Sequence, residues 1–183
     1  MILALAGRRI DDPNSDDCKF PSTEAPRIAH EVRALFLENA VTVLVSSAAC
    51  GADLIALSEA GELGIRRRII LPYGREEFRQ KSVMDRPGNW GAIYDRILDE
   101  IGAKGDLVVL DESGQADPYS ATNRRIISEA LDLGAQTEQA VSAAVIWDGV
   151  ERNDFDYTAD FRDEAHRRGL RLFNLFTLGG NSK

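Results

Sequence analysis

The stretch VSSAACGAD, which begins at Val45, combines small side chains with a carboxylate where a strand is expected to give way to a helix. Small side chains let a ligand approach the backbone closely, and the first turn of a helix offers free N–H groups to an anion. The same pattern is typical of a tight strand-to-helix turn that binds nothing. Asp53 is expected to cap the helix, a role that its residue type and place fit. The candidates for ligand binding in this stretch are Ser47, Gly51, Ala52 and Asp53.

Other polar side chains follow further apolar runs. Arg8 comes directly after such a run, where a guanidinium could bind a phosphate in a bidentate manner or pair instead with Asp11 or Asp12. Arg79 belongs to a basic segment that fits a solvated loop equally well. We expect Tyr119 and Asn123 to contact a base or a ribose. The candidates for ligand binding outside the small-residue stretch are Gly7, Arg8, Arg79, Ser82, Tyr119, Asn123, Asp148, Gly149 and Thr158.

Apolar runs that alternate with helical patterns must position these residues. The runs predict strands over 2–6, 41–45, 68–71, 107–110, 143–147 and 170–175. Helical patterns predict helices over 25–39, 90–101, 119–134 and 157–168, and a further helix that follows the small-residue stretch and ends near Gly64. The segments 8–24 and 73–89 are predicted loops, and Arg66, Arg67 and Arg68 are interpreted as surface charge before the third strand.

Most of these strands are apolar throughout, which is typical of a parallel sheet covered on both faces. We therefore predict an α/β, doubly wound, Rossmann-like fold with a mainly parallel six-stranded sheet and helices on both faces. A single domain is expected over 1–178, followed by a flexible C-terminal tail over 179–183. Such sheets bind ligands at the carboxyl ends of the strands, near the point where strand order reverses.

Composition narrows the class of partner. The chain of 183 residues carries a formal net charge of −8, which disfavours binding of a nucleic-acid polymer. No apolar run is long enough to cross a membrane, and the N-terminal MILALAGRRI has its positive charge on the wrong side of its apolar run for a signal peptide, so a cytoplasmic location is expected. Cys18 and Cys50 lack the spacing of a zinc site. Asp148, Asp154, Asp156 and Asp160 are dense but lack a calcium-loop spacing, so we expect no metal and no cofactor.

Four segments resemble one superfamily. These are GRR after the first strand, CGADLIALSEAGELG, ILPY with EEFRQKSV, and the late WDG with its threonine. They resemble the SLOG superfamily of Rossmann-like domains, which includes lysine-decarboxylase-like phosphoribohydrolases and DNA-processing protein A, over a span from about Leu3 to Leu175. The resemblance implies binding of a nucleotide or nucleotide-derived small molecule, either for sensing or for cleavage of the N-glycosidic bond of nucleoside monophosphates. It also implies a homodimer as one arrangement.

One departure favours sensing over hydrolysis. The hydrolytic members carry a GGxGTxxE element, whereas here Asp156 and Tyr157 precede Thr158 and Phe161 stands in the place of the glutamate. The sequence leaves two alternatives to a sensor open. One is an N-glycosidase with Glu59 or Asp160 as the catalytic candidate, and the other is a protein-interaction module that binds no ligand.

Overall fold

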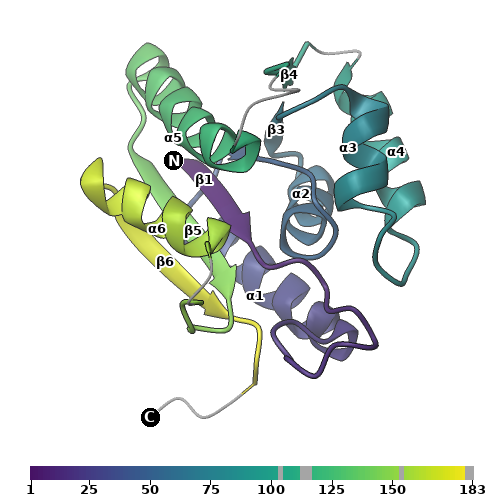
Figure 1. Ribbon diagram of the computed structural model, residues 1–183. Helices are drawn as coiled ribbons and strands as arrows, with labels where there is room; N and C mark the ends of the chain where they lie inside the picture. Colours follow the sequence, from purple (N-terminus) through teal and green to yellow (C-terminus); the bar gives the residue numbers. More distant parts are fainter. Residues whose placement is uncertain (103–104, 112–116, 153–154, 180–183) are drawn as a thin grey trace.

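The computed structural model describes residues 1–102, 105–111, 117–152 and 155–179, and these form one domain around a six-stranded parallel sheet (Figure 1). The strand order is β4-β3-β2-β1-β5-β6. The predicted α/β doubly wound fold is therefore confirmed, whereas most of the predicted tail lies outside the described residues. The strands are β1 (Ile2–Gly7), β2 (Val43–Ser46), β3 (Arg66–Leu71), β4 (Leu107–Val109), β5 (Val141–Trp147) and β6 (Arg171–Phe176).

The order of the strands reverses beside β1. From β1 the chain proceeds outward through β2 and β3 to β4, then crosses back to β5 and β6 on the other side. Leu5 of β1 is in register with Ser46 of β2, and Gly7 is in register with Ile146 of β5. The carboxyl ends of β1, β2 and β5 consequently lie next to one another, at the position where ligands bind in this class of fold.

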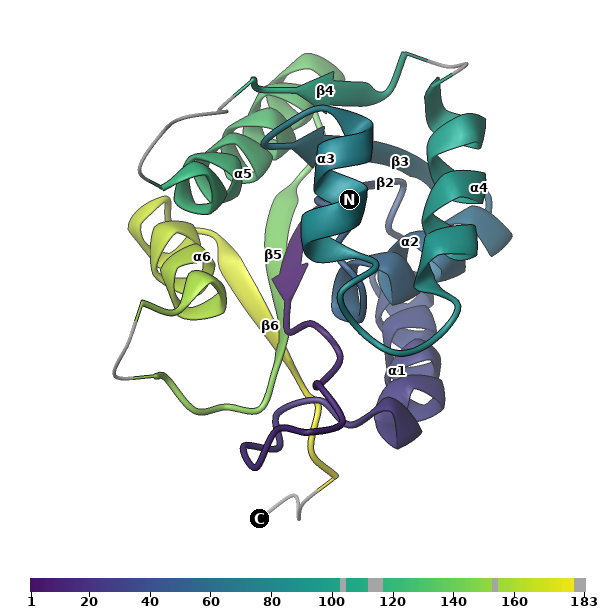
Figure 2. The ribbon, with the colours of Figure 1, turned by 45° about the vertical axis from the view of Figure 1, so that its right-hand side comes forward.

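Helices cover both faces of the sheet (Figures 1 and 2). Successive residues of β1 serve different cores, because side chains alternate across a strand. Leu3 and Leu5 pack with the first layer of helices, and Ile2 and Ala4 with the second. This double burial explains the unbroken apolar run. The first layer holds α1 (Ala25–Glu38), α2 (Ala52–Glu62), α3 (Arg75–Ser82) and α4 (Trp90–Gly102), and the second holds α5 (Pro118–Thr137) and α6 (Tyr157–Arg167).

Two predictions of local structure were wrong. Helix α3 lies inside the predicted loop 73–89, where Phe78 is its main apolar anchor and stacks on Tyr94 of α4 with ring centroids 6.2 Å apart. Strand β3 begins at Arg66, two residues before the predicted strand 68–71, so Arg66 and Arg67, which were interpreted as surface charge before the strand, belong to it together with Arg68. Their guanidinium groups bind the carboxylates of Asp106, Glu100 and Glu129, in chain order, at 2.7–2.9 Å.

No helix in the described part of the chain is both long enough and apolar enough to span a membrane. Cys18 is exposed, Cys50 is buried, and both thiols are free.

Candidate functional site

A cleft of about 450 Å³ lies at the carboxyl ends of β1 and β2 and is bounded by the starts of α2, α5 and α6. The structure brings together eight of the predicted ligand-binding residues in its lining, namely Gly7, Arg8, Ser47, Asp53, Ser82, Tyr119, Asn123 and Thr158. The other five lie outside the lining, namely Gly51, Ala52, Arg79, Asp148 and Gly149.

The turn from β2 to α2 is tightly packed against the backbone that follows β1. Gly51 has a φ of 97° and is the N-cap of α2. A Cβ atom at Gly51 would lie 2.7 Å from the nitrogen of Ile10 and 2.8 Å from the carbonyl oxygen of Arg8, so only glycine fits here. The next residue, Ala52, donates its N–H to that same carbonyl of Arg8 at 3.1 Å. Gly51 and Ala52 therefore serve the packing of this turn.

Asp53 does not cap α2 as the sequence predicted. The helix starts at Ala52, so Gly51 is its N-cap and Asp53 is its second residue. Its side chain is buried at the cleft, where Oδ2 accepts the N–H of Ala49 at 3.2 Å. Burial raises the pKa of the Asp53 carboxyl to about 7, although the bond from Ala49 acts in the opposite direction.

The floor of the cleft carries polar atoms that the described residues leave without partners. These atoms are Oδ1 of Asp53 and Oγ of Ser47. Nε of Arg152, which also lines the cleft, and Oγ of Ser46, which is not part of the lining, likewise lack a hydrogen-bond partner among the described residues. A buried polar atom without a partner costs roughly 1–3 kcal/mol, so such atoms are rare in native proteins and call for an explanation. An occupant of the cleft that hydrogen-bonds to Ser47 and Asp53 would supply one.

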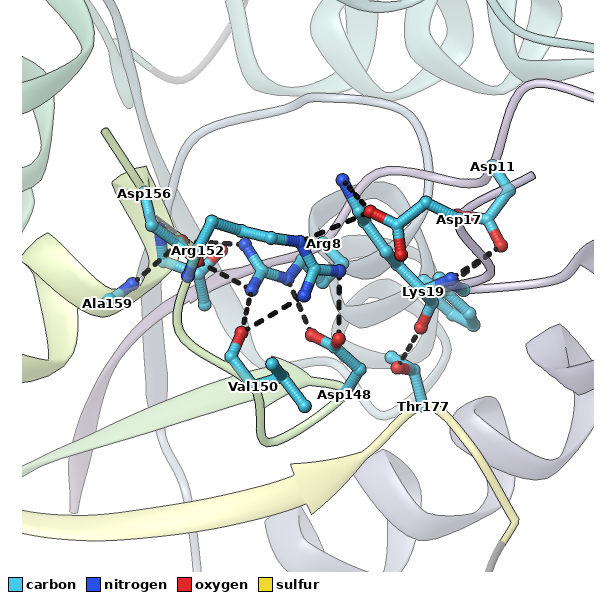
Figure 3. A network of polar contacts seen from close by, with 12 residues as sticks. Arg8, Asp11, Asp17, Lys19, Asp148, Val150, Arg152, Asp156, Ala159 and Thr177 are labelled. Atoms are coloured by element: carbon cyan, nitrogen blue, oxygen red, sulfur yellow. Dashed lines mark hydrogen bonds and ion pairs between the residues drawn. The ribbon is translucent and has the colours of Figure 1, made fainter. Parts of the chain in front are cut away.

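At the turn from β5 to α6, charged side chains of the protein bind one another (Figure 3). Arg8 binds both oxygens of Asp156 at 2.6 and 2.7 Å, and its Nε donates to Asp148 at 2.9 Å. These partners replace Asp11 and Asp12, which the sequence offered as the alternative to a ligand. Asp156 also accepts the N–H groups of Thr158 and Ala159 at 3.0 and 3.1 Å, and so caps α6.

The pKa of the Asp156 carboxyl is lowered, although burial alone would raise it. Hydrogen bonds from Arg8 and from the N–H of Ala159, together with the positive charge of Arg8, outweigh the burial. Asp156 is therefore ionised at neutral pH, and its charge occupies the start of α6 where a phosphate would otherwise bind.

Sequence reasoning missed Arg152. Its Nη2 donates to Asp148 at 2.9 Å, so the carboxylate of Asp148 bridges Arg152 and Arg8 (Figure 3). Arg152 also lines the cleft. The sequence offered one signal for this pairing, because Arg152 lies four residues after Asp148 in the loop that follows β5.

A row of aromatic rings along one wall of the cleft was also missed. The ring of Tyr157 lies 5.1 Å from that of Tyr119 and 5.0 Å from that of Phe155, between ring centroids. Tyr157 and Phe155 are 41% and 63% exposed, which is unusual for large apolar groups and leaves their faces open to a ligand. The Tyr119 hydroxyl shares a hydrogen bond of 3.2 Å with Oγ of Ser82.

The two predicted catalytic candidates lie away from the lining. Glu59 binds Arg33 of α1 at 3.0 Å. Asp160 accepts a hydrogen bond of 3.1 Å from Asn123, which also donates to the carbonyl of Tyr157 and so ties α5 to α6.

The remaining candidates outside the cleft have structural partners. Arg79 binds Asp95 of α4 at 3.0 Å. Gly149 has a φ of 81°, and a Cβ atom there would lie 3.1 Å from the ring of Phe176.

Comparison with known proteins gives a likeness of fold. No protein family profile and no curated protein sequence matches the chain. Among solved structures, the chain is similar to DNA processing protein A (DprA) from Streptococcus pneumoniae, with a TM-score of 0.44 and 18% sequence identity. The match covers 94% of this chain and 58% of that one. So remote a likeness carries no argument about the site, which is therefore interpreted from its own geometry.

Proposed function

We propose that the protein binds a nucleotide or a nucleotide-derived small molecule in this cleft and acts as a sensor of it. The observation that carries the proposal is the pair of buried oxygens on the cleft floor, Oγ of Ser47 and Oδ1 of Asp53, which find no partner in the described part of the chain. A ribose hydroxyl or a ring N–H can hydrogen-bond to both kinds of oxygen. The position of the cleft at the reversal of strand order supports the same proposal.

A panel of ribonucleosides, nucleotides, NAD and ADP-ribose, measured by thermal shift and then by calorimetry, tests this function. A ligand at 100 times its Kd adds roughly 2.7 kcal/mol of stability, which gives a visible shift. Ser47→Ala should weaken the binding of any hit about tenfold, because one hydrogen bond to the ligand is lost. Ser128→Ala on α5, whose hydroxyl lies near Arg168 instead, is the matched control and should bind as the native protein does. The proposal fails if nothing on the panel binds.

Cleavage of an N-glycosidic bond is the second candidate function, and one observation favours it. The buried Asp53 carboxyl, with its pKa raised to about 7, holds a proton in the range where a general acid works. Asp53 lines the cleft, whereas Glu59 binds Arg33 and Asp160 binds Asn123 outside the lining. Free base released during the panel experiment, and lost in Asp53→Asn, would identify a hydrolase. An intact ligand would identify a sensor.

A further inference from the structure

The positive charges of the cleft are all engaged by carboxylates. Arg8 and Arg152 share Asp148, and Arg9 and Arg86 share Asp85 at 2.7 and 2.8 Å. The lysines are engaged in the same way. Lys19 binds Asp17 at 3.0 Å and Lys81 binds Glu77 at 2.7 Å.

The starts of α2 and α6 at the cleft also carry a carboxyl group of the chain itself. Asp156 accepts the first N–H groups of α6. Asp53 sits in the first turn of α2, with one oxygen buried and unpartnered among the described residues. Two places that attract phosphate in other proteins of this architecture therefore each carry an acidic side chain of the chain itself. The chain as a whole carries a net charge of −8, which also opposes a highly charged anion.

One wall of the cleft is aromatic, and two of its rings flank Asp156 in the sequence. The ring of Tyr157 contacts those of Tyr119 and Phe155, and the rings of Tyr157 and Phe155 are widely exposed. Exposed aromatic faces stack on planar rings, and such stacking tolerates different bases because every base has a π-face. Near the row lie polar groups suited to hydroxyls and ring nitrogens, namely the hydroxyl of Ser82 and the unpartnered oxygens of Ser47 and Asp53.

We infer that the cleft selects a nucleoside-like ligand, with a planar base stacked on Tyr157 and Phe155 and with little or no phosphate charge. This inference rests on the proposed function and narrows its ligand class. Stacking and hydrogen bonds to hydroxyls supply the affinity. Each added phosphate must compete with Asp156 for Arg8 and for the first N–H groups of α6, and it also meets the carboxyl of Asp53 at the start of α2.

Calorimetry with adenosine, guanosine, cytidine and uridine, each beside its 5′-monophosphate and 5′-triphosphate, tests the inference. Ribose 5-phosphate is the probe that has a phosphate but no base. The best nucleoside should bind at least as tightly as its monophosphate and about tenfold or more tightly than its triphosphate, because each phosphate meets uncompensated negative charge. Ribose 5-phosphate should not compete.

Two substitutions separate the stacking from the charge. Phe155→Ala should weaken nucleoside binding about tenfold, since stacking on an aromatic ring is lost. Phe176→Ala, which removes another exposed ring on β6, is the control and should leave binding unchanged. At pH 8, where Asp53 is ionised, Asp53→Asn keeps the shape of the side chain and removes its charge, so it should shift the ratio of affinities several-fold toward the monophosphate.

The outcomes distinguish this inference from the function beneath it. If affinity rises with each phosphate, or if Phe155→Ala binds as the native protein does, the inference is overturned while the cleft remains a nucleotide site. If no nucleoside or nucleotide binds, the proposed function fails and the inference fails with it.

Discussion

Two strand-to-helix turns meet at the same cleft and differ in how their polar groups are satisfied. At the start of α6, Asp156 binds two backbone N–H groups and the guanidinium of Arg8. At the start of α2, Gly51 caps the helix without a side chain, and Asp53 keeps one buried oxygen that is unpartnered in the described structure. The polar groups of the first turn are satisfied within the protein, whereas the described residues leave Oδ1 of Asp53 in the second turn without a partner.

The two carboxylates differ in pKa for the same reason. Asp156 is buried, but its cationic and N–H partners lower its pKa, whereas Asp53 is buried with a single backbone donor and its pKa rises to about 7. The comparison teaches that a carboxylate at a helix start has no fixed role. Its partners decide its pKa and whether its oxygens are satisfied within the protein.

The largest effect is expected at the α6 turn. Asp156→Ala removes the bidentate partner of Arg8 and both cap bonds. It leaves the largely buried guanidinium of Arg8 with Asp148 as its remaining carboxylate partner among the described residues. The free energy of unfolding should fall by roughly 3–5 kcal/mol, measured by urea denaturation. Asp163→Ala is the control, because that exposed carboxylate pairs with Arg162 at the surface and should cost less than about 1 kcal/mol. Equal stability of the two variants would refute the contrast between the turns.

A smaller effect, dependent on pH, is expected at the α2 turn. The pKa of Asp53 is higher in the folded than in the unfolded chain, so the folded chain holds this proton more tightly. The stability that comes from protonation of Asp53 is therefore lost as pH rises from about 4 through 7. Asp53→Asn should stabilise the protein by about 2–3 kcal/mol more at pH 8 than at pH 5.

Urea unfolding of both proteins at the two pH values measures this difference, and the comparison cancels the titration of all other groups. Ser47→Ala carries no titratable change and should show the native pH dependence. A benefit of Asp53→Asn that is the same at pH 5 and pH 8 would mean that Asp53 is already ionised throughout the range. The response of Asp156 is of opposite sign and lies lower, because its stabilising charge is lost only as pH falls below about 4.

The smallest effect is expected at Glu59, further along α2. Its carboxylate binds Arg33 between α1 and α2 and lies outside the cleft. Glu59→Gln should leave ligand affinity, and any release of base, unchanged in calorimetry and product analysis. A loss of either would show that the cleft extends along α2 beyond its first turn.

Much of the fold could be predicted because buried strands and helix faces leave apolar patterns over short stretches of sequence. The continuous apolar runs of β1 and β5 indicated central parallel strands, and the stripe on α4 indicated its buried face. Helix α3 was missed because its one buried apolar side chain, Phe78, is surrounded by charged residues. The arginines of β3 were misread because their carboxylate partners come from other elements.

The site was only partly predictable for the same physical reason. Gly7 and Ser47 could be found because polar or small residues directly follow apolar runs. The engagement of Arg8 could not be found, since Asp148 and Asp156 lie 140 and 148 positions away. The cap of α2 was misplaced by two residues because only the backbone geometry at Gly51 decides where the first turn begins.

That long separation also bears on how the protein folds. Strand β1 lies at the centre of the sheet, yet one of its two neighbours is β5, so its pairing is completed only after residue 147 has been made. The ion pair between Arg8 and Asp156 closes a loop of 148 residues. Such contacts form late in folding, because the entropy of closing the loop is lost before the contact stabilises the chain. Weakening this cluster should therefore accelerate unfolding while leaving the rate of folding almost unchanged. The lifetime of the cleft, rather than the speed of its assembly, depends on Arg8.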